Sequence, residues 1–330
     1  MTRKPQAAAE QRPGSFWGDF MREAILALAI GLAPIAAAAA EGPGWAFPVT
    51  DKVQPKTVPD DGKPKTAPGS DKTYTRKEIN DLFNPPDWYP GMHPPMPQVV
   101  AHGDAPKVRA CAACHLPTGT GHDESAYVAA LSARYTIEQM AAYKSGARKG
   151  SGSMTTIAQS ITPDEIHVAA DYFAALKPRK WIRVVETETV PKTYVGPGNK
   201  RLRLPGGGSE PIGNRIIEIP ENEDVVLNRD PRLGFIAFVP NGSIAKGKAL
   251  AQGGGGKTIA CAICHGPTLQ GLGDVPPIAG RQATYVVRHL FMIQDGDRSG
   301  ASVALMQAVV KNLTVDDMLA LAAYTASREP

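Results

Sequence analysis

The chain has 330 residues, with 36 Lys and Arg against 32 Asp and Glu, which leaves a formal net charge of +4 at pH 7. A surplus this small, with no basic run longer than two residues, argues against nucleic acid as a partner. Hydrophobic residues make up 42% of the chain and charged residues 21%, as in ordinary globular proteins. The 33 glycines and 30 prolines predict long connecting segments between folded parts.

Residues 1–40 have the pattern of an export signal. Four basic residues precede an apolar run, residues 24–40, which ends in small residues. The run is rich in alanine, contains Pro34 and is short for a membrane span, which needs roughly 20 apolar residues. We therefore expect cleavage after Ala40 and a periplasmic protein. A retained segment would instead associate the chain with the inner membrane.

The rest of the chain contains a repeat. An offset of 150 residues aligns 111–148 with 261–298, and an offset of 152 extends the match to the last helical segment of each copy. Each copy predicts helices joined by loops, among them 134–144 and 284–294. The last helix of the first copy begins with Thr162 followed by Pro163 and Glu165, a capping box, and Thr314 with Asp317 is a looser version in the second copy.

Two further segments differ from the repeat. Residues 41–100 are rich in proline and predict an extended N-terminal arm. Residues 179–243 contain clusters of β-branched and aromatic residues separated by turn sequences, which predict a connector with strands. The expected fold is therefore mainly α-helical, with two helical domains at 101–178 and 244–330, a β-containing connector and a Pro-rich arm.

All four cysteines lie in two Cys-x-x-Cys-His motifs at equivalent positions of the repeat. This motif is typical of c-type haem attachment, in which two thiols add to the porphyrin vinyl groups and the adjacent imidazole takes one axial position on iron. Zinc would require the two pairs to converge, and a redox dithiol does not require the histidine. We expect two covalent haem c groups, bound by Cys111, Cys114 and His115 and by Cys261, Cys264 and His265.

The second axial ligand has several candidates. Met154 and Met306 are the only equivalent pair, each eight residues before a helix-capping threonine, in Gly/Ser-containing segments that predict loops. We therefore expect them to be the iron ligands. The other candidates lack a matching residue in the other copy or lie in or near the arm, and we expect packing or surface roles for them: Met140, Met292, Met318, His122, His167, His289, His93, His102, Met92 and Met96.

With these motifs, the two repeats resemble class I cytochrome c domains in tandem, similar to the dihaem cytochromes of the c4 type, over 102–177 and 244–328. In that family a Pro-x-Leu-x-Gly segment follows the motif, and its proline carbonyl accepts a hydrogen bond from the haem-ligating histidine. Residues 276–280 match this segment in the second copy. The first copy has Ala126 in place of the proline, and we expect its backbone carbonyl to take that role.

The resemblance implies an electron carrier rather than an enzyme. His/Met ligation fills both axial positions, and methionine raises the reduction potential. Redox proteins, either an oxidase or a dehydrogenase, would dock at an exposed haem edge. Two alternatives stay open: a cytochrome subunit held on such a complex by the arm and connector, and a dihaem peroxidase, which would need one open iron.

Overall fold

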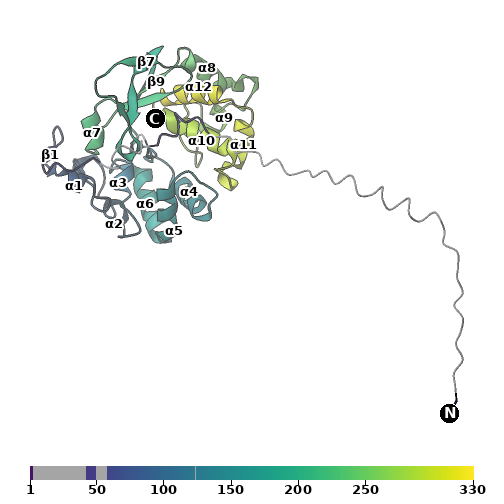
Figure 1. Ribbon diagram of the computed structural model, residues 1–330, viewed down its shortest axis with the longest axis horizontal. Coiled ribbons are helices and arrows are strands. Elements are labelled where there is room, and N and C mark those ends of the chain that lie inside the picture. The colour runs from purple at the N-terminus through teal and green to yellow at the C-terminus, as the bar shows by residue number, and fades with distance from the viewer. Residues whose placement is uncertain (3–41, 50–57, 123) are drawn as a thin grey trace. The chain divides into compact units, whose positions relative to one another are not determined.

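The computed structural model describes residues 1–2, 42–49, 58–122 and 124–330 (Figure 1). The expected export signal therefore lies almost wholly outside the described residues. Within the described segments, no helix is both long and apolar enough to cross a membrane. The arm, both repeats and the connector fall in one unit, Ala40–Pro330.

The first repeat is helical, as predicted. It contains α3 (Ala112–His115), α4 (Ala133–Ser145), α5 (Gly152–Ser160) and α6 (Pro163–Ala175). Helix α4 begins at the Ser132 cap and ends at Gly146, whose φ of 79° suits the left-handed position that terminates a helix. Helix α6 begins with the capping box of Thr162 and Glu165, which confirms that prediction.

The second repeat has the same order of helices. It contains α9 (Ala262–His265), α10 (Ala283–Asp295), α11 (Ala304–Val310) and α12 (Val315–Ala326), preceded by α8 (Ser243–Gly253). Thr314 and Asp317 form a complete capping box at the start of α12, so this cap is as regular as the first one. Helices α8 and α12 approach closely because Gly247 has no side chain: a Cβ there would collide with the Ala320 carbonyl oxygen.

The connector forms strands, as expected. Its main sheet has the order β3 (Ile182–Glu186), β9 (Phe235–Val239), β8 (Ile217–Pro220), with β9 parallel to β3 and antiparallel to β8. Alternate residues of β9 are buried, as in a strand with one face on the core. The remaining elements are two short antiparallel pairs, an α-helix and a 3-10 helix: β4 (Thr189–Pro191) with β7 (Ser209–Pro211), β5 (Thr193–Val195) with β6 (Arg201–Arg203), α7 (Glu223–Leu227) and η2 (Pro197–Asn199).

The N-terminal arm also contains regular structure. It has β1 (Lys65–Thr66) paired with β2 (Thr73–Tyr74), then α1 (Arg76–Ile79) and α2 (Gln98–Ala101). Ala67, Ile79 and Trp88 form a small buried cluster of their own. The sequence predicted only an extended segment here, because these elements are too short to show a periodic pattern.

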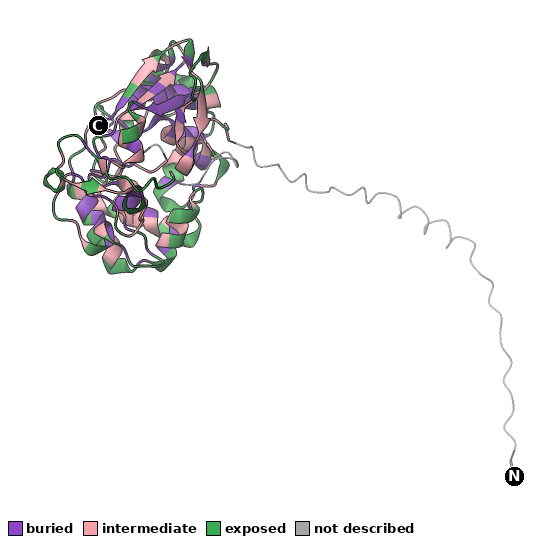
Figure 2. Cartoon of the chain, turned by 60° about the vertical axis from the view of Figure 1, so that its left-hand side comes forward, coloured by how far each residue is buried: buried purple, intermediate pink, exposed green. Residues whose placement is uncertain are grey.

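The main hydrophobic core is continuous through both repeats and the connector (Figure 2). Trp181 of the connector packs edge to face against Tyr127, with ring centroids 5.6 Å apart, and against Phe235 at 5.4 Å. Its indole nitrogen donates a hydrogen bond to the Gly280 carbonyl oxygen at 3.2 Å. The connector therefore packs against both repeats, and the five-part division of the chain stays a prediction.

The two repeats also contact each other directly. Arg148 and Arg298, which occupy equivalent positions, pair as an isolated antiparallel bridge. Flanking hydrogen bonds join the amide of Lys149 to the Asp297 carbonyl oxygen at 2.8 Å and the amide of Ser299 to the Ala147 carbonyl oxygen at 2.7 Å. Since equivalent residues pair with each other, the contact has local twofold character.

Candidate haem-binding site

Each Cys-x-x-Cys-His motif forms one short helical turn. In both copies the carbonyl of the first cysteine, Cys111 or Cys261, accepts a hydrogen bond at 2.9 Å from the amide of the histidine four residues later. Residues four apart lie on the same side of a helix. The chain then turns away at Leu116 (φ 60°) or Gly266 (φ 80°). This local geometry places the first cysteine and the histidine of each motif on the same side.

One cavity of about 1700 Å³ contains both motifs. Its volume exceeds the usual range for a small-molecule pocket, about 300–1,000 Å³. Its wall comes from both repeats. All eight residues predicted to bind haem line it: Cys111, Cys114, His115, Met154, Cys261, Cys264, His265 and Met306. The sequence predicted two separate sites, and the structure shows them joined.

Both histidines are oriented by a backbone carbonyl. His115 Nδ1 lies 2.9 Å from the Ala126 oxygen, and His265 Nδ1 lies 2.7 Å from the Pro276 oxygen, which confirms the hydrogen bonds that the resemblance implied. A carbonyl can only accept, so Nδ1 carries the proton and Nε2 has the lone pair that a metal requires. Burial is the main cause that lowers the pKa of both imidazoles, which favours this neutral form.

No disulfide joins the four cysteines. Burial raises the pKa of Cys111 to about 12 and that of Cys261 to about 11, so both stay protonated at neutral pH. Among the described residues, no group of three or more His, Cys, Asp or Glu side chains could hold a metal ion. The two Cys pairs therefore do not converge as a zinc site would require.

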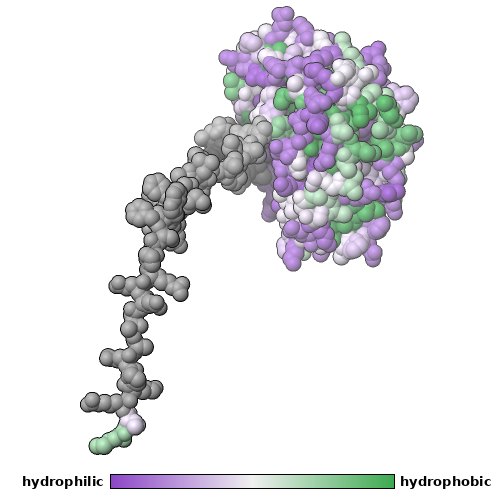
Figure 3. All heavy atoms as spheres, turned by 90° about the vertical axis from the view of Figure 1, so that its right-hand side faces the viewer, coloured by the Kyte–Doolittle hydropathy of each residue, from purple (hydrophilic) through white to green (hydrophobic). Residues whose placement is uncertain are grey.

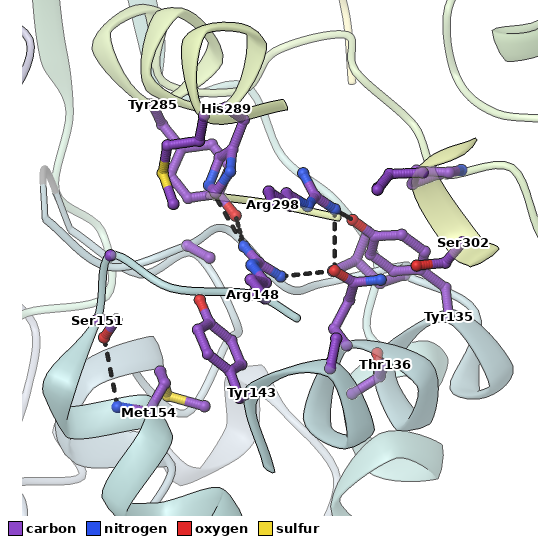
Figure 4. Close-up of a pocket in the computed structure, with 18 of the residues that line it drawn as sticks. Tyr135, Thr136, Tyr143, Arg148, Ser151, Met154, Tyr285, His289, Arg298 and Ser302 are labelled. Atoms are coloured by element: carbon purple, nitrogen blue, oxygen red, sulfur yellow. Dashed lines mark hydrogen bonds between the residues drawn. The ribbon is translucent and has the colours of Figure 1, made fainter. Parts of the chain in front are cut away.

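Met154 and Met306 both line the cavity, but the secondary structure predicted for them was wrong. Met154 lies within α5 and Met306 within α11, rather than in loops. The Ser151 side chain caps α5 by accepting a hydrogen bond from the Met154 amide at 3.3 Å (Figure 4). Glycine and serine suggested a loop, although this serine is the helix cap.

The other candidate ligands divide into two groups. Met140, Met292 and His289 line the same cavity, whereas Met318 is fully buried in α12 and does not line it. The remaining histidines also lie outside the cavity lining: His93, His102, His122 and His167. In the arm, His102 Nδ1 is 2.9 Å from Asn84 Oδ1.

Three buried arginines provide a test of whether the cavity suits haem. Arg148 and Arg281 are each 5% exposed and Arg298 is 8% exposed, and none has a carboxylate within ion-pair distance in the part of the chain that the structure describes. All three line the cavity. Buried charges are costly without a counter-ion, and burial lowers the pKa of Arg281. The two propionates of a haem are carboxylates, so the cavity fits the group.

Two of these arginines link the repeats through a polar network (Figure 4). Arg148 donates to the Tyr285 hydroxyl at 3.1 Å, and Arg298 donates to the Tyr135 hydroxyl at 2.8 Å. Both also donate to Gln139 Oε1, at 2.8 and 2.9 Å. No role was predicted for these residues, although Tyr135 matches Tyr285 and Arg148 matches Arg298 across the repeat, which was a visible signal.

Comparisons with known proteins also favour a haem-binding site. No family model matches the chain. The thiosulfate dehydrogenase electron acceptor of Thiomonas intermedia is 24% identical over 226 residues, which is 68% of this chain and 80% of that protein. Cytochrome c-554(548) of Halomonas halodenitrificans is 36% identical over 80 residues, 24% of this chain and 96% of its own length. Cytochrome c4 of Pseudomonas aeruginosa is 31% identical over 86 residues, 24% of this chain and 43% of that protein.

Solved structures give weaker overlaps. The thiosulfate dehydrogenase TsdBA from Marichromatium purpuratum has a TM-score of 0.48 and 28% identity, covering 70% of this chain, which spans only 39% of that structure. Cytochrome c4 from Acidithiobacillus ferrooxidans has a TM-score of 0.43 and 24% identity, covering 66% of this chain and 97% of that one.

The 36% identity across nearly all of cytochrome c-554(548) establishes the class: this chain belongs to the c-type cytochromes. It contains covalently bound haem c and transfers electrons between redox partners. Within the class it resembles the tandem cytochromes of the c4 type, which agrees with the repeated motif.

Proposed function

We propose that the chain carries two haem c groups, one on each motif, and shuttles single electrons in the periplasm. The observation that supports this most is the presence of two equivalent ligand sets in one cavity, each with a histidine held through Nδ1. The cavity volume, above the usual range for one small ligand, also favours two groups. The periplasmic location rests on the N-terminal sequence.

Haem c supplies an iron centre that gains or loses one electron. The residues of this chain would hold that centre: the two cysteines of each motif would attach the porphyrin through thioether bonds, and His115 and His265 would each offer Nε2 to the metal. The carbonyls of Ala126 and Pro276 fix the orientation of the two imidazoles. The buried arginines of the cavity would offset the charge of the propionates.

Met154 and Met306 are the proposed second axial ligands. Two observations support this role: the two residues occupy equivalent positions of the repeat, and both line the cavity. A methionine thioether on each iron would raise its reduction potential and would leave no coordination site open for a substrate. The proposed function is therefore electron transfer rather than peroxidase activity.

The proposed electron donor is a dehydrogenase, and thiosulfate dehydrogenase is the first one to test. The support is the 24% identity with the electron acceptor of thiosulfate dehydrogenase over 80% of that protein. Electrons from thiosulfate would pass through the enzyme to ferric haem on this chain, one per iron.

Mixing the oxidised holoprotein with thiosulfate dehydrogenase and thiosulfate tests the donor. We expect the absorption bands of reduced haem c to appear with a rate that depends on the enzyme concentration, and to be absent without thiosulfate. A holoprotein that dithionite reduces fully, but that the enzyme and thiosulfate leave oxidised, would rule out this donor. Stable co-purification with the enzyme would identify a bound subunit rather than a free carrier.

A further inference from the structure

The two motifs differ in exposure although they are repeats. Around the second motif, apolar side chains face solvent: Ile263 is 69% exposed and Leu272 is 66% exposed, and neither lines the cavity. We call these two residues the second-motif face. Ile259 and Leu305 are also exposed, but they line the cavity, where bound haem would cover them. Cys264, next to Ile263 in the chain, is exposed.

The second-motif face carries no formal charge in its own segment of sequence. Residues 258–273, which supply it, contain no Lys, Arg, Asp or Glu. The charged residues that border this segment are paired: Lys257 with Asp317 at 2.9 Å, and Asp274, two residues from Leu272, with Arg134 at 3.2 Å. Figure 3 shows hydrophobic residues gathered on the side of the molecule that carries α9 and α11 in Figure 1. Contiguous exposed apolar surface of this kind is typical of interaction sites.

In the first motif, the residues between the two cysteines and the residue after the histidine are covered instead. Ala112 and Ala113 are 0% exposed, and Leu116 is 1% exposed. The guanidinium of Arg229, from the connector, donates a hydrogen bond to the Ala113 carbonyl oxygen, which lies between the two cysteines of the motif. The arm is also bonded to the residue before this motif, because the Ala110 amide donates a hydrogen bond to the Leu82 carbonyl oxygen at 3.0 Å.

The arm and the connector are hydrogen-bonded to each other beside the first motif. The Trp88 indole of the arm donates to the Asn228 carbonyl oxygen at 2.9 Å, next to Arg229. The buried Arg76 donates to the Leu227 carbonyl oxygen and to Asn228 Oδ1, the latter at 2.8 Å. Trp88 is 1% exposed and Arg76 is 6% exposed, so these hydrogen bonds come from buried side chains.

We infer that redox partners dock on the second-motif face alone, and that the first haem exchanges electrons with them through the second. This rests on the proposed function, since it needs a haem on each motif. The partner that fits is a redox protein with an apolar, uncharged docking surface, because a charged surface would lose hydration here without gaining an ion pair. Docking should therefore depend little on salt.

A second copy of this chain presents such a surface, so electron self-exchange between reduced and oxidised holoprotein is the probe. Its rate is measured from exchange broadening of haem resonances in partly reduced samples. We expect Ile263→Glu and Leu272→Glu to slow self-exchange about 10-fold, because each contact would bury unpaired carboxylates. Val168→Glu is the matched control, since Val168 is an exposed apolar residue, 46%, on α6 away from the cavity lining, and it should leave the rate unchanged.

Three measurements separate the outcomes. Haem content and full reduction by dithionite establish that each variant is loaded; a wild-type protein with no covalent haem would overturn the proposed function itself. Wild-type self-exchange should change less than about twofold between about 0.01 and 0.5 M salt. With loaded protein, the docking inference is overturned if the Ile263 and Leu272 variants exchange at the wild-type rate, or if Val168→Glu slows exchange as much as they do.

Discussion

His115 and His265 differ in the residue that orients them. Both donate from Nδ1 to a carbonyl, but Pro276 has a fixed φ and Ala126 does not. The hydrogen-bond acceptors could be predicted from the motif resemblance, since a backbone carbonyl is present whatever the side chain. The burial that keeps both imidazoles neutral could not, because it depends on the cavity formed by both repeats.

The proposed methionine ligands lead to a prediction about the reduction potential of each haem. Met154→Ala and Met306→Ala should each lower the potential of one haem, on the order of 100 mV, because an axial thioether favours ferrous iron. Met140→Ala is the control, since Met140 lines the same cavity but has no equivalent methionine in the second repeat. A spectroelectrochemical titration measures all three. Equal shifts in the Met140 and Met154 variants would contradict the assigned ligation.

At the scale of helices, the sequence predicted the four longest and missed the shorter ones, including α8, which has 11 residues. Helices α4, α6, α10 and α12 have apolar periodicity or a recognisable cap. Helices α5 and α11 follow Gly/Ser-rich segments and have at most nine residues, too few for a period to be evident. The elements that carry Met154 and Met306 were therefore misjudged, while the residues themselves were found from the repeat.

The ion pairs of Asp317, at the N-terminus of α12, predict a contact with α8 that weakens in acid. Asp317 has a side chain that is 1% exposed and lies 2.9 Å from the ammonium groups of both Lys246 and Lys257. Burial alone would raise the pKa of Asp317, but the hydrogen bonds from Lys257, Lys246 and Thr314 outweigh it and hold the pKa well below its ordinary value. A depressed carboxyl pKa stabilises the fold above the unfolded-state pKa of about 4, and that stability is lost as the pH falls through the lower, folded-state value.

Asp317→Asn should accordingly lower the free energy of unfolding at pH 7 by about 3 kcal/mol and flatten its loss in acid. Glu165→Gln, at the equivalent cap of α6, should cost less than about 1 kcal/mol because that site is exposed. Urea unfolding of the two holoprotein variants from pH 7 to pH 3 measures both effects. An Asp317 variant with the acid profile of the wild type would contradict this account of the contact.

At the scale of the whole molecule, the arrangement of the parts was least predictable. Several contacts beside the first motif join residues more than 100 positions apart, such as Arg76 with Asn228 and Arg229 with Ala113. No local pattern reports such contacts. The repeat predicted two similar motifs, whereas the residues between the cysteines are buried in the first motif and Ile263 of the second is 69% exposed.

The number of porphyrins on the chain tests the central claim most directly. Intact-mass spectrometry together with a pyridine haemochrome assay should find two covalent haem groups on the wild-type protein. The double variants Cys111→Ala/Cys114→Ala and Cys261→Ala/Cys264→Ala should each retain one. A wild-type chain with no porphyrin adduct, or with a single one, would contradict the account.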